Sequence, residues 1–291
     1  MKQNFNRVII IAFDGLDYQK IRKYDCENVM QEEFGKISLE NMPLTTGPLW
    51  SSFITGMHPE EHGVQKTMNW TNQKVQKFEN LMGDLPFTDF WKGIRWTIFR
   101  NLGSLNAGVV GAYRENLEVN ETIFEDIEPS ISLNVPGQDI NTALSTIIIS
   151  RALGKDAPLP KDVMERDIDA EHLKRKEETF EALKDENFAL LMSHFHKSDF
   201  MQHLYGFSEE KERELYRVFD KLAGEIKEYA SDDDLLIFCS DHGLEDGGHR
   251  DQAFYSLNHE LGLENPHITE FRDILKSIEV KRAEEIRELD L

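Results

Sequence analysis

Three acidic residues and three histidines have the types and the spacing needed to bind divalent metal ions. Asp14, Asp199 and Asp241 each follow a short apolar run of the chain. His203 comes four residues after Asp199, which places both side chains on one face of a helical turn. His242 directly follows Asp241, and His249 comes seven residues later. A catalytic zinc ion takes about three protein ligands, so this larger set predicts two ions about 3.5–4 Å apart.

The stretch "PLTTGPLWSSFITGMHPEEHGV", residues 43–64, adds a hydroxyl group that could act as a nucleophile. One interpretation is purely structural: Thr46 caps a helix that has Pro48 in its first turn and ends at Gly56. In the other, Thr46 attacks phosphorus. A threonine hydroxyl must lose its proton to attack, and a bound divalent cation stabilises the alkoxide. A helix N-terminus also favours a phosphoryl group. The acidic residues and histidines elsewhere in the chain favour the nucleophile.

Regular elements should bring these residues together. Three stretches of the chain, Val8–Phe13, 188–199 and 234–243, contain apolar runs typical of buried parallel strands. The runs are followed by Asp14, Asp199 and Asp241. Between the last two, apolar residues at helical spacing predict an amphipathic helix with Ser208 as its N-cap: Leu215, Val218, Phe219, Leu222, Ile226 and Tyr229. Strand, helix and strand form a unit of a parallel sheet, and ligands bind at the carboxyl ends of such strands.

Both ends of the chain are therefore expected to form one catalytic core, from residues 1–66 and 186–291. Residues 67–185 would partly form a cap or insertion. Within them, 161–187 has the pattern of a pair of charged, solvated helices. The stretch 87–103 alternates basic and aromatic residues, which suits a membrane surface or a cap over a site; we favour the cap. A last helix is predicted over 268–279, with one apolar face.

Composition excludes several classes of protein. Fifty-four acidic and 33 basic residues give a net charge of −21, so the surface as a whole does not suit nucleic acid. Cys26 and Cys239 offer neither a disulfide framework nor a cysteine-type zinc site. No run reaches the apolar length of a membrane span, and the first apolar run is too short for a signal peptide. These features predict a cytoplasmic protein, and they leave a homo-oligomer open.

The order of the motifs resembles the alkaline phosphatase superfamily, in particular its type I phosphodiesterase / nucleotide pyrophosphatase branch. The similarity rests on "AFDG", "TTGPLWSSFITGMHPEEHGV", "KSDFMQH", "SDHG" and "GGHRDQAFYS". It implies an α/β fold, a three-layer α/β/α sandwich around a mostly parallel sheet with a cap insertion. It also implies phosphoester hydrolysis through a phosphothreonine intermediate at Thr46, on a small phosphate ester such as a nucleotide or another diester.

The resemblance further implies roles for individual residues. One metal ion would be held by Asp14, Thr46, Asp241 and His242, and the other by Asp199, His203 and His249. Zinc is the first expectation and manganese the second. His62 would support the nucleophile's helix, and His194 and His196 would lie in a supporting layer or at the surface. Gly47 would leave room for phosphate oxygens.

One position departs from the branch. Its nucleotide pyrophosphatases hold a phosphate oxygen with an asparagine, and Thr67 stands at that position here, with Asn69 two residues later. Nucleotide specificity is therefore open. A phosphomonoesterase, a phosphomutase relative and a non-catalytic metal-binding homologue remain alternatives. A sulfatase is disfavoured because "TGPLW" lacks the modifiable Cys or Ser and the arginine of the sulfatase motif.

Overall fold

A six-stranded mixed sheet forms the centre of the protein in the computed structural model, which describes residues 3–65, 68–70, 109–111, 117–119, 121–139, 161–185, 187–205 and 208–281. The strands lie in the order β3-β11-β8-β2-β7-β6. Their bounds are β3 Glu33–Lys36, β11 Phe254–Leu257, β8 Leu235–Cys239, β2 Val8–Phe13, β7 Leu190–Phe195 and β6 Ser130–Leu133. The neighbours β8, β2, β7 and β6 are parallel, whereas β11 is antiparallel to both of its neighbours. The three strands predicted from the sequence are adjacent and parallel, so that prediction is confirmed.

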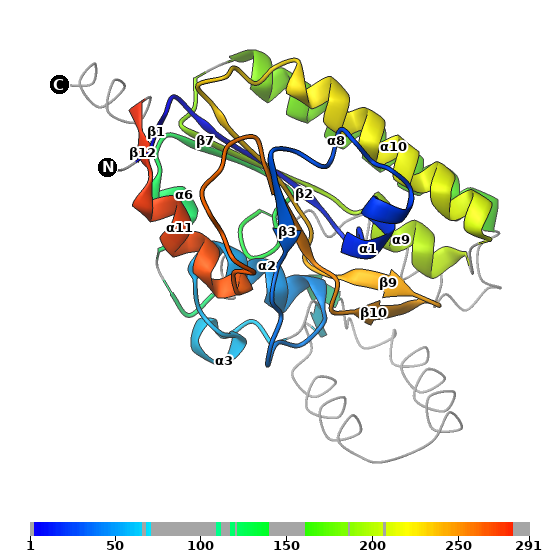
Figure 1. Ribbon diagram of the computed structural model, residues 1–291. Helices are drawn as coiled ribbons and strands as arrows, with labels where there is room; N and C mark the ends of the chain where they lie inside the picture. The colour runs from blue at the N-terminus through cyan, green and yellow to red at the C-terminus, as the bar shows by residue number, and fades with distance from the viewer. Residues whose placement is uncertain are drawn as a thin grey trace.

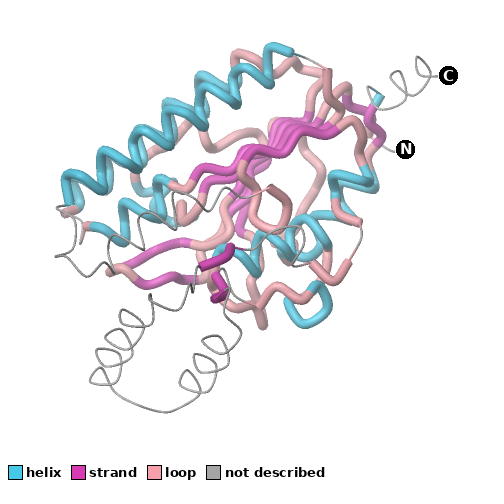
Figure 2. The backbone as a smooth tube through the Cα atoms, turned by 180° about the vertical axis from the view of Figure 1, so that it is seen from behind, coloured by secondary structure: helices cyan, strands magenta, loops and turns pink. Residues whose placement is uncertain are grey.

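Helices cover both faces of this sheet, as Figures 1 and 2 show from opposite sides. The long helices α8 and α10 lie on one face with α1 and α9, and α2, α6 and α11 lie on the other. Their bounds are α1 Tyr18–Lys23, α2 Thr46–Thr55, α3 Pro59–His62, α6 Ile123–Asp126, α8 Lys161–Asp185, α9 Lys197–Leu204, α10 Glu209–Lys227 and α11 Phe271–Ser277, which follows the 3-10 turn Ile268–Glu270. The predicted three-layer α/β/α sandwich is confirmed.

Strand β2 shows why this architecture forms. Its residues are fully buried, and they alternate between two apolar clusters. Val8, Ile10 and Ala12 face the cluster of α2 and α11, and Ile9, Ile11 and Phe13 face the cluster of α8 and α10. Only a strand covered on both sides can bury an unbroken apolar run in this way.

Short strands pair at the margins of the core. They are β1 Asn4–Phe5 with β12 Glu279–Val280, β4 Met68–Trp70 with β5 Val109–Gly111, and β9 Gly243–Glu245 with β10 Gly248–Arg250. The β9–β10 hairpin turns through Asp246 and Gly247, whose φ angles are 49° and 76°. Two left-handed residues in a two-residue loop form the turn that suits a hairpin's twist.

The structure changes two details of the helix predictions. The segment 161–187 forms one helix, α8, of 25 residues, and not a pair. It contains no glycine or proline that would break it, and Ile168, Thr179 and Leu183 are buried along it. In α10 the predicted stripe is buried except at Val218, which is 38% exposed, and Tyr229, which is half-buried. Ser208 caps this helix as predicted, by accepting a hydrogen bond from Lys211 N.

Part of the segment 67–185 contributes to the core. Strand β6 and helix α8 both come from the segment 67–185, yet β6 pairs with β7 and α8 packs beside them. These two elements belong to the core. The stretch 87–103 and Thr67 lie outside the described residues, and of Asn69 only the backbone, in β4, is described. A cap formed by this part of the chain stays a prediction.

Candidate metal centre

The ends of three adjacent strands deliver the three aspartates to one place. Asp14 follows β2 directly, Asp199 stands in the first turn of α9 after β7, and Asp241 follows β8 by two residues. Their exposed fractions are 1%, 6% and 0%. Three buried carboxylates repel one another unless cations or protons neutralise them, so their convergence requires a chemical explanation.

One group of ligand atoms consists of Asp199, His203 and His249. Asp199 Oδ1 lies 3.2 Å from His203 Nε2 and 3.4 Å from His249 Nε2, and the two nitrogens are 2.9 Å apart. Ligands on a tetrahedral ion with bonds of about 2.0–2.1 Å lie about 3.3 Å from one another. The three residues predicted to share one metal ion therefore lie at metal-ligand spacing.

A second group surrounds Oδ1 of Asp14. Thr46 Oγ1 donates a hydrogen bond to this oxygen over 3.3 Å, and His242 Nε2 lies 3.5 Å from it. Asp241 Oδ2 is 3.4 Å from the same His242 nitrogen. Asp199 Oδ1, 4.0 Å from His242 Nε2, reaches this group as well. The four residues predicted for the other ion are thus neighbours, and Asp199 lies between the two groups.

Backbone carbonyls fix which nitrogen each histidine presents. Nδ1 of His249 lies 2.6 Å from the Leu44 carbonyl oxygen, and Nδ1 of His242 lies 3.3 Å from that of Gly243. When Nδ1 donates to a carbonyl, Nε2 keeps the lone pair that a metal needs. The β9–β10 hairpin positions His249 for this contact. The Asp246-Gly247 pair that turns the hairpin is the signal in the sequence by which this hairpin could have been predicted.

Thr46 lies at the start of helix α2 and not at its cap. The N-cap is Thr45, with extended φ and ψ of −143° and 138°, so Thr46 is the first helical residue. The capping interpretation of Thr46 is therefore wrong by one residue. The helix ends at Gly56 in the left-handed conformation, as predicted. Thr46 is 8% exposed, and its hydroxyl points to Asp14 at the N-terminal end of the helix.

The pKa values reflect the crowding of charge. Burial raises the pKa of Asp14 well above its usual value, and the charges of Asp241 and Asp199 raise it further. Burial also raises the pKa of Asp241. Burial alone would raise that of Asp199 too, but contacts with His203 and His249 outweigh it and lower the pKa. Without cations the site favours the protonated form of Asp14 and Asp241. Asp199 Oδ1, Asp241 Oδ2 and His242 Nε2 have no hydrogen-bond partner among the described residues. These residues fit divalent cations.

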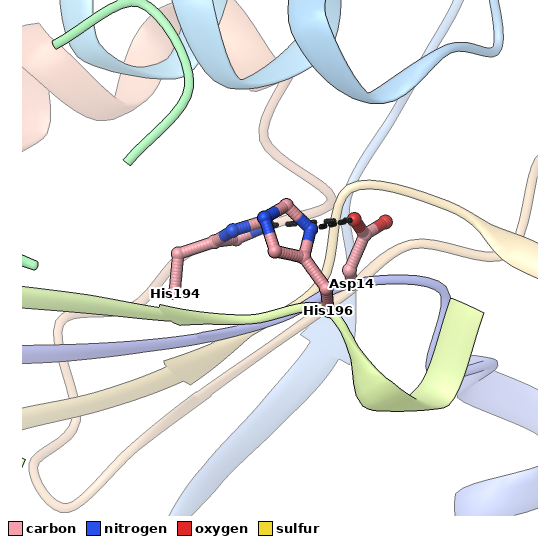
Figure 3. Close-up of side chains that lie close together, drawn as sticks. All are labelled: Asp14, His194 and His196. Atoms are coloured by element: carbon pink, nitrogen blue, oxygen red, sulfur yellow. Dashed lines mark hydrogen bonds and ion pairs between the residues drawn. The ribbon is translucent and has the colours of Figure 1, made fainter. Parts of the chain in front are cut away.

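Residues expected only as support lie closer to the site than the sequence suggested. His194 and His196 are buried, at 0% and 5% exposed, and both imidazoles point to the carboxylate of Asp14, as Figure 3 shows. Burial lowers the pKa of His196 to about 4 and lowers that of His194 well below its usual value, which favours the neutral form of both rings. The signal available in the sequence was their i, i+2 spacing at the end of an apolar run, with His194 on β7 and His196 directly after it. His62 bonds to Ser52 over 2.9 Å and thereby ties α3 to α2, a supporting position.

Trp50 of α2 does not line the site. It is fully buried in α2, where its ring packs against Phe53 and His194. The position faces the sheet, so a substrate cannot reach it. Gly47 lies in the first turn of α2, next to Thr46.

Comparisons with known proteins agree with these motifs. The profile described as "Type I phosphodiesterase / nucleotide pyrophosphatase" matches residues 8–284. A curated relative, GPI ethanolamine phosphate transferase 3 of Schizosaccharomyces pombe, is 23% identical over 265 residues. This alignment covers 88% of the chain and 25% of the relative, so the chain spans about a quarter of that protein's length.

One solved structure shows a similar fold over nearly its whole length. The PH0037 protein from Pyrococcus horikoshii superposes with a TM-score of 0.51 at 12% identity, over 94% of this chain and 98% of that one. Murine ectonucleotide pyrophosphatase / phosphodiesterase 5 gives a TM-score of 0.46 at 14% identity, over 81% of this chain and 57% of that one. In the described residues no helix has both the length and the apolar character of a membrane span. With its profile match over nearly the whole length, the chain belongs to the type I phosphodiesterase / nucleotide pyrophosphatase family.

Proposed function

We propose that this protein hydrolyses phosphate esters through a phosphothreonine intermediate at Thr46, with two divalent metal ions bound at the strand ends. The observation that carries the proposal is the place of the Thr46 hydroxyl. It lies in the first turn of α2, 3.3 Å from Asp14 Oδ1, beside two groups of carboxylates and imidazoles at metal-ligand spacing. A hydroxyl with a merely structural role would not need this setting.

Each of the two proposed metal ions has its own set of ligands. Asp199, His203 and His249 would hold one ion, and Asp14, Thr46, Asp241 and His242 the other. Zinc suits this mixture of imidazole and carboxylate, and manganese is the second choice. When bound, such ions neutralise the carboxylates, favour the Thr46 alkoxide and stabilise charge on the transferring phosphoryl group.

The chain's own groups account for each bond. Thr46 gives up its hydroxyl proton as Oγ1 attacks phosphorus, the bond from phosphorus to the leaving oxygen breaks, and the leaving oxygen takes up one proton and departs as the alcohol. The hydroxyl proton of Thr46 points to Asp14 Oδ1. The positive end of the dipole of α2, at Thr46, favours the negative charge of the phosphoryl group. Water then attacks the same phosphorus, the bond to Oγ1 breaks, and Thr46 regains its proton as inorganic phosphate or a monoester leaves.

The relative from S. pombe is named as a transferase. Transfer to an alcohol would use the same intermediate and differ only in the second acceptor. We favour water, and the alcohol becomes one arm of the test.

The experiment is a panel of phosphate monoesters and diesters, assayed after exhaustive chelation and again after addition of zinc or manganese, with and without glycerol as acceptor. Chelation should abolish turnover and lower the melting temperature by about 5 °C or more, because ions that bind only the native state stabilise it. Acid quenching during turnover should trap one phosphoryl group on Thr46, detected by mass spectrometry. Unchanged melting and turnover after chelation would contradict the metal dependence, and glycerol phosphate as the main product would favour the transferase.

A further inference from the structure

Asp14 faces a third set of ligand atoms with its other carboxylate oxygen. Oδ2 lies 3.0 Å from His196 Nδ1 and 3.6 Å from His194 Nε2. Both histidines come from the end of β7, which pairs in parallel with β2 so that His194 lies opposite Ala12, two residues before Asp14. The ring centroids are 4.3 Å apart, with the planes nearly perpendicular, so both rings point to one spot beside Oδ2 (Figure 3).

Hydrogen bonding alone does not explain this arrangement. The 3.0 Å contact fits a hydrogen bond from His196 Nδ1 to Asp14. The 3.6 Å contact of His194 is too long for one. His194 is 0% exposed, and its Nε2 has no hydrogen-bond partner among the described residues. A buried polar atom without a partner is costly, and here it is aimed at a carboxylate.

We propose that Asp14 Oδ2, His194 and His196 form a third divalent-cation site, separate from the two groups that surround Thr46 and Asp199. Distances of 3.0 and 3.6 Å bracket the separation of about 3.3 Å expected between two ligands of one tetrahedral ion. One ion would satisfy all three atoms at once. Two imidazoles and one carboxylate select a transition metal such as zinc, cobalt or manganese over magnesium and calcium, which prefer oxygen ligands.

The charges nearby are compatible with a cation. Asp14 stands next to Asp199 and Asp241, so the spot lies at the edge of a region with excess negative charge. The cation that acts on both histidines is Arg175 of α8. Its guanidinium is paired with Glu178 at 2.6 Å and Glu171 at 3.6 Å, which offsets its charge.

Such an ion would make Asp14 a bridge. Oδ1 faces Thr46 and His242, and Oδ2 faces the two β7 histidines. An ion on Oδ2 would fix the carboxylate in place and withdraw negative charge from the oxygen that contacts the nucleophile. The site belongs to the protein's own metal chemistry and does not depend on which ester is hydrolysed.

The direct test is a crystal of the wild-type protein grown with cobalt or zinc, with anomalous diffraction measured on both sides of the metal's absorption edge. We expect a peak within bonding distance of Asp14 Oδ2, His194 Nε2 and His196 Nδ1. Peaks beside Asp199 and Asp241 with none at this spot would overturn the third site and leave the two-metal proposal standing. A peak at this spot with none beside Asp199 would support the third site and contradict the two-metal proposal.

Metal content measured by inductively coupled plasma mass spectrometry gives a second readout. The reconstituted wild type should bind three ions per chain, and the His194→Ala/His196→Ala variant should bind two. The matched control is His172→Ala, which removes another buried histidine that packs against Phe195 and should keep three. Circular dichroism checks that the variants are folded. Equal metal content in wild type and double variant would contradict the site.

Discussion

Each oxygen of the Asp14 carboxylate faces different partners. Oδ1 receives the Thr46 hydroxyl, and Oδ2 faces the imidazoles of His194 and His196. Asp14 therefore connects the proposed nucleophile to the interior of the sheet. Because the carboxylate is buried, its preferred charge depends on what surrounds it, and a change in these neighbours should alter the reactivity of Thr46.

Substitutions at Thr46 test the nucleophile most directly. Thr46→Ala removes the attacking oxygen, so kcat should fall by about 10³-fold or more, while the melting temperature stays within a few degrees. Thr46→Ser keeps a hydroxyl and should retain part of the activity. The measurement is steady-state kinetics on the best substrate of the ester panel.

Thr45→Ala is the matched control, because Thr45 is the N-cap and its side chain makes no capping hydrogen bond. It should lower kcat by less than about tenfold, as expected for a residue outside the chemistry. Full activity in Thr46→Ala, or an equal loss in both alanine variants, would contradict the assignment.

The sequence predicted which residues gather at the site but not all of their contacts. Asp14, Asp199 and Asp241 could be expected near one another because each comes shortly after an apolar run of the chain. The approach of His194 to Asp14 depends on the register between β2 and β7, which pairs Ala12 with His194. A shift of one residue would turn both histidines to the other face of the sheet. Local patterns predict a strand, but packing sets its register.

Strands β2 and β8 are also joined at the end opposite the site. The guanidinium of Arg7, just before β2, donates to both oxygens of Asp234, just before β8, over 3.2 and 2.7 Å. Both side chains are buried. Burial alone would raise the pKa of Asp234, but the bonds from Arg7 and Ser231 outweigh it and lower the pKa.

Asp234→Asn should therefore reduce the free energy of unfolding by about 3 kcal/mol at pH 7, because Arg7 keeps a buried charge without its partner. A carboxyl with a lowered pKa in the folded state stabilises above its unfolded pKa of about 3.9, and this contribution fades as the pH falls through the folded value. The difference in the free energy of unfolding between wild type and variant should thus narrow below about pH 4. Urea unfolding of both proteins from pH 7 to pH 3 measures this difference.

Asp233→Asn is the control, since Asp233 is the exposed neighbour. It should change stability by less than about 0.5 kcal/mol. A gap between wild type and Asp234→Asn that stays constant down to pH 3 would show that the pair's charge does not contribute.

Helices were less fully predicted than strands. The stripe of α10 was clear because apolar and charged residues alternate at helical spacing along it. The sequence predicts two helices where the structure has the single helix α8, since this stretch is rich in charge and has no clear apolar face. It buries Arg175, whose charge is paired, and His172, whose ring packs on Phe195 and Phe219. Polar residues buried through specific partners leave no hydrophobic period to detect.

The charge of the whole protein bears on the choice of substrate. With a net charge of −21 the surface does not attract a phosphomonoester dianion. Arg250, next to His249, is paired with Asp17 at 2.5 Å and Glu245 at 2.7 Å. Lys20 is paired with Glu212 at 2.5 Å. These two basic side chains therefore form ion pairs within the protein, which offsets the charge that they could offer to a phosphate ester.

A diester carries one negative charge less, so kcat/KM should be higher for bis-p-nitrophenyl phosphate than for p-nitrophenyl phosphate under the same metal and salt. Raising the ionic strength should narrow the difference, because salt screens the surface charge. Parallel assays of the two esters measure both effects. A tenfold preference for the monoester, about 1.4 kcal/mol of transition-state binding, would move the protein toward the phosphomonoesterases or phosphomutases.

The adjacency of β7, β2 and β8 has a consequence for partly loaded protein. Each group of ligands includes an aspartate that follows β2, β7 or β8, and the spacing of these strands is set by their backbone hydrogen bonds and not by the ions. One position can therefore fill while another stays vacant, and a sample short of metal is a mixture of loaded forms of one folded chain. If turnover needs two ions, its rate should follow the product of two occupancies, so activity would lag behind metal uptake early in a titration and catch up near saturation.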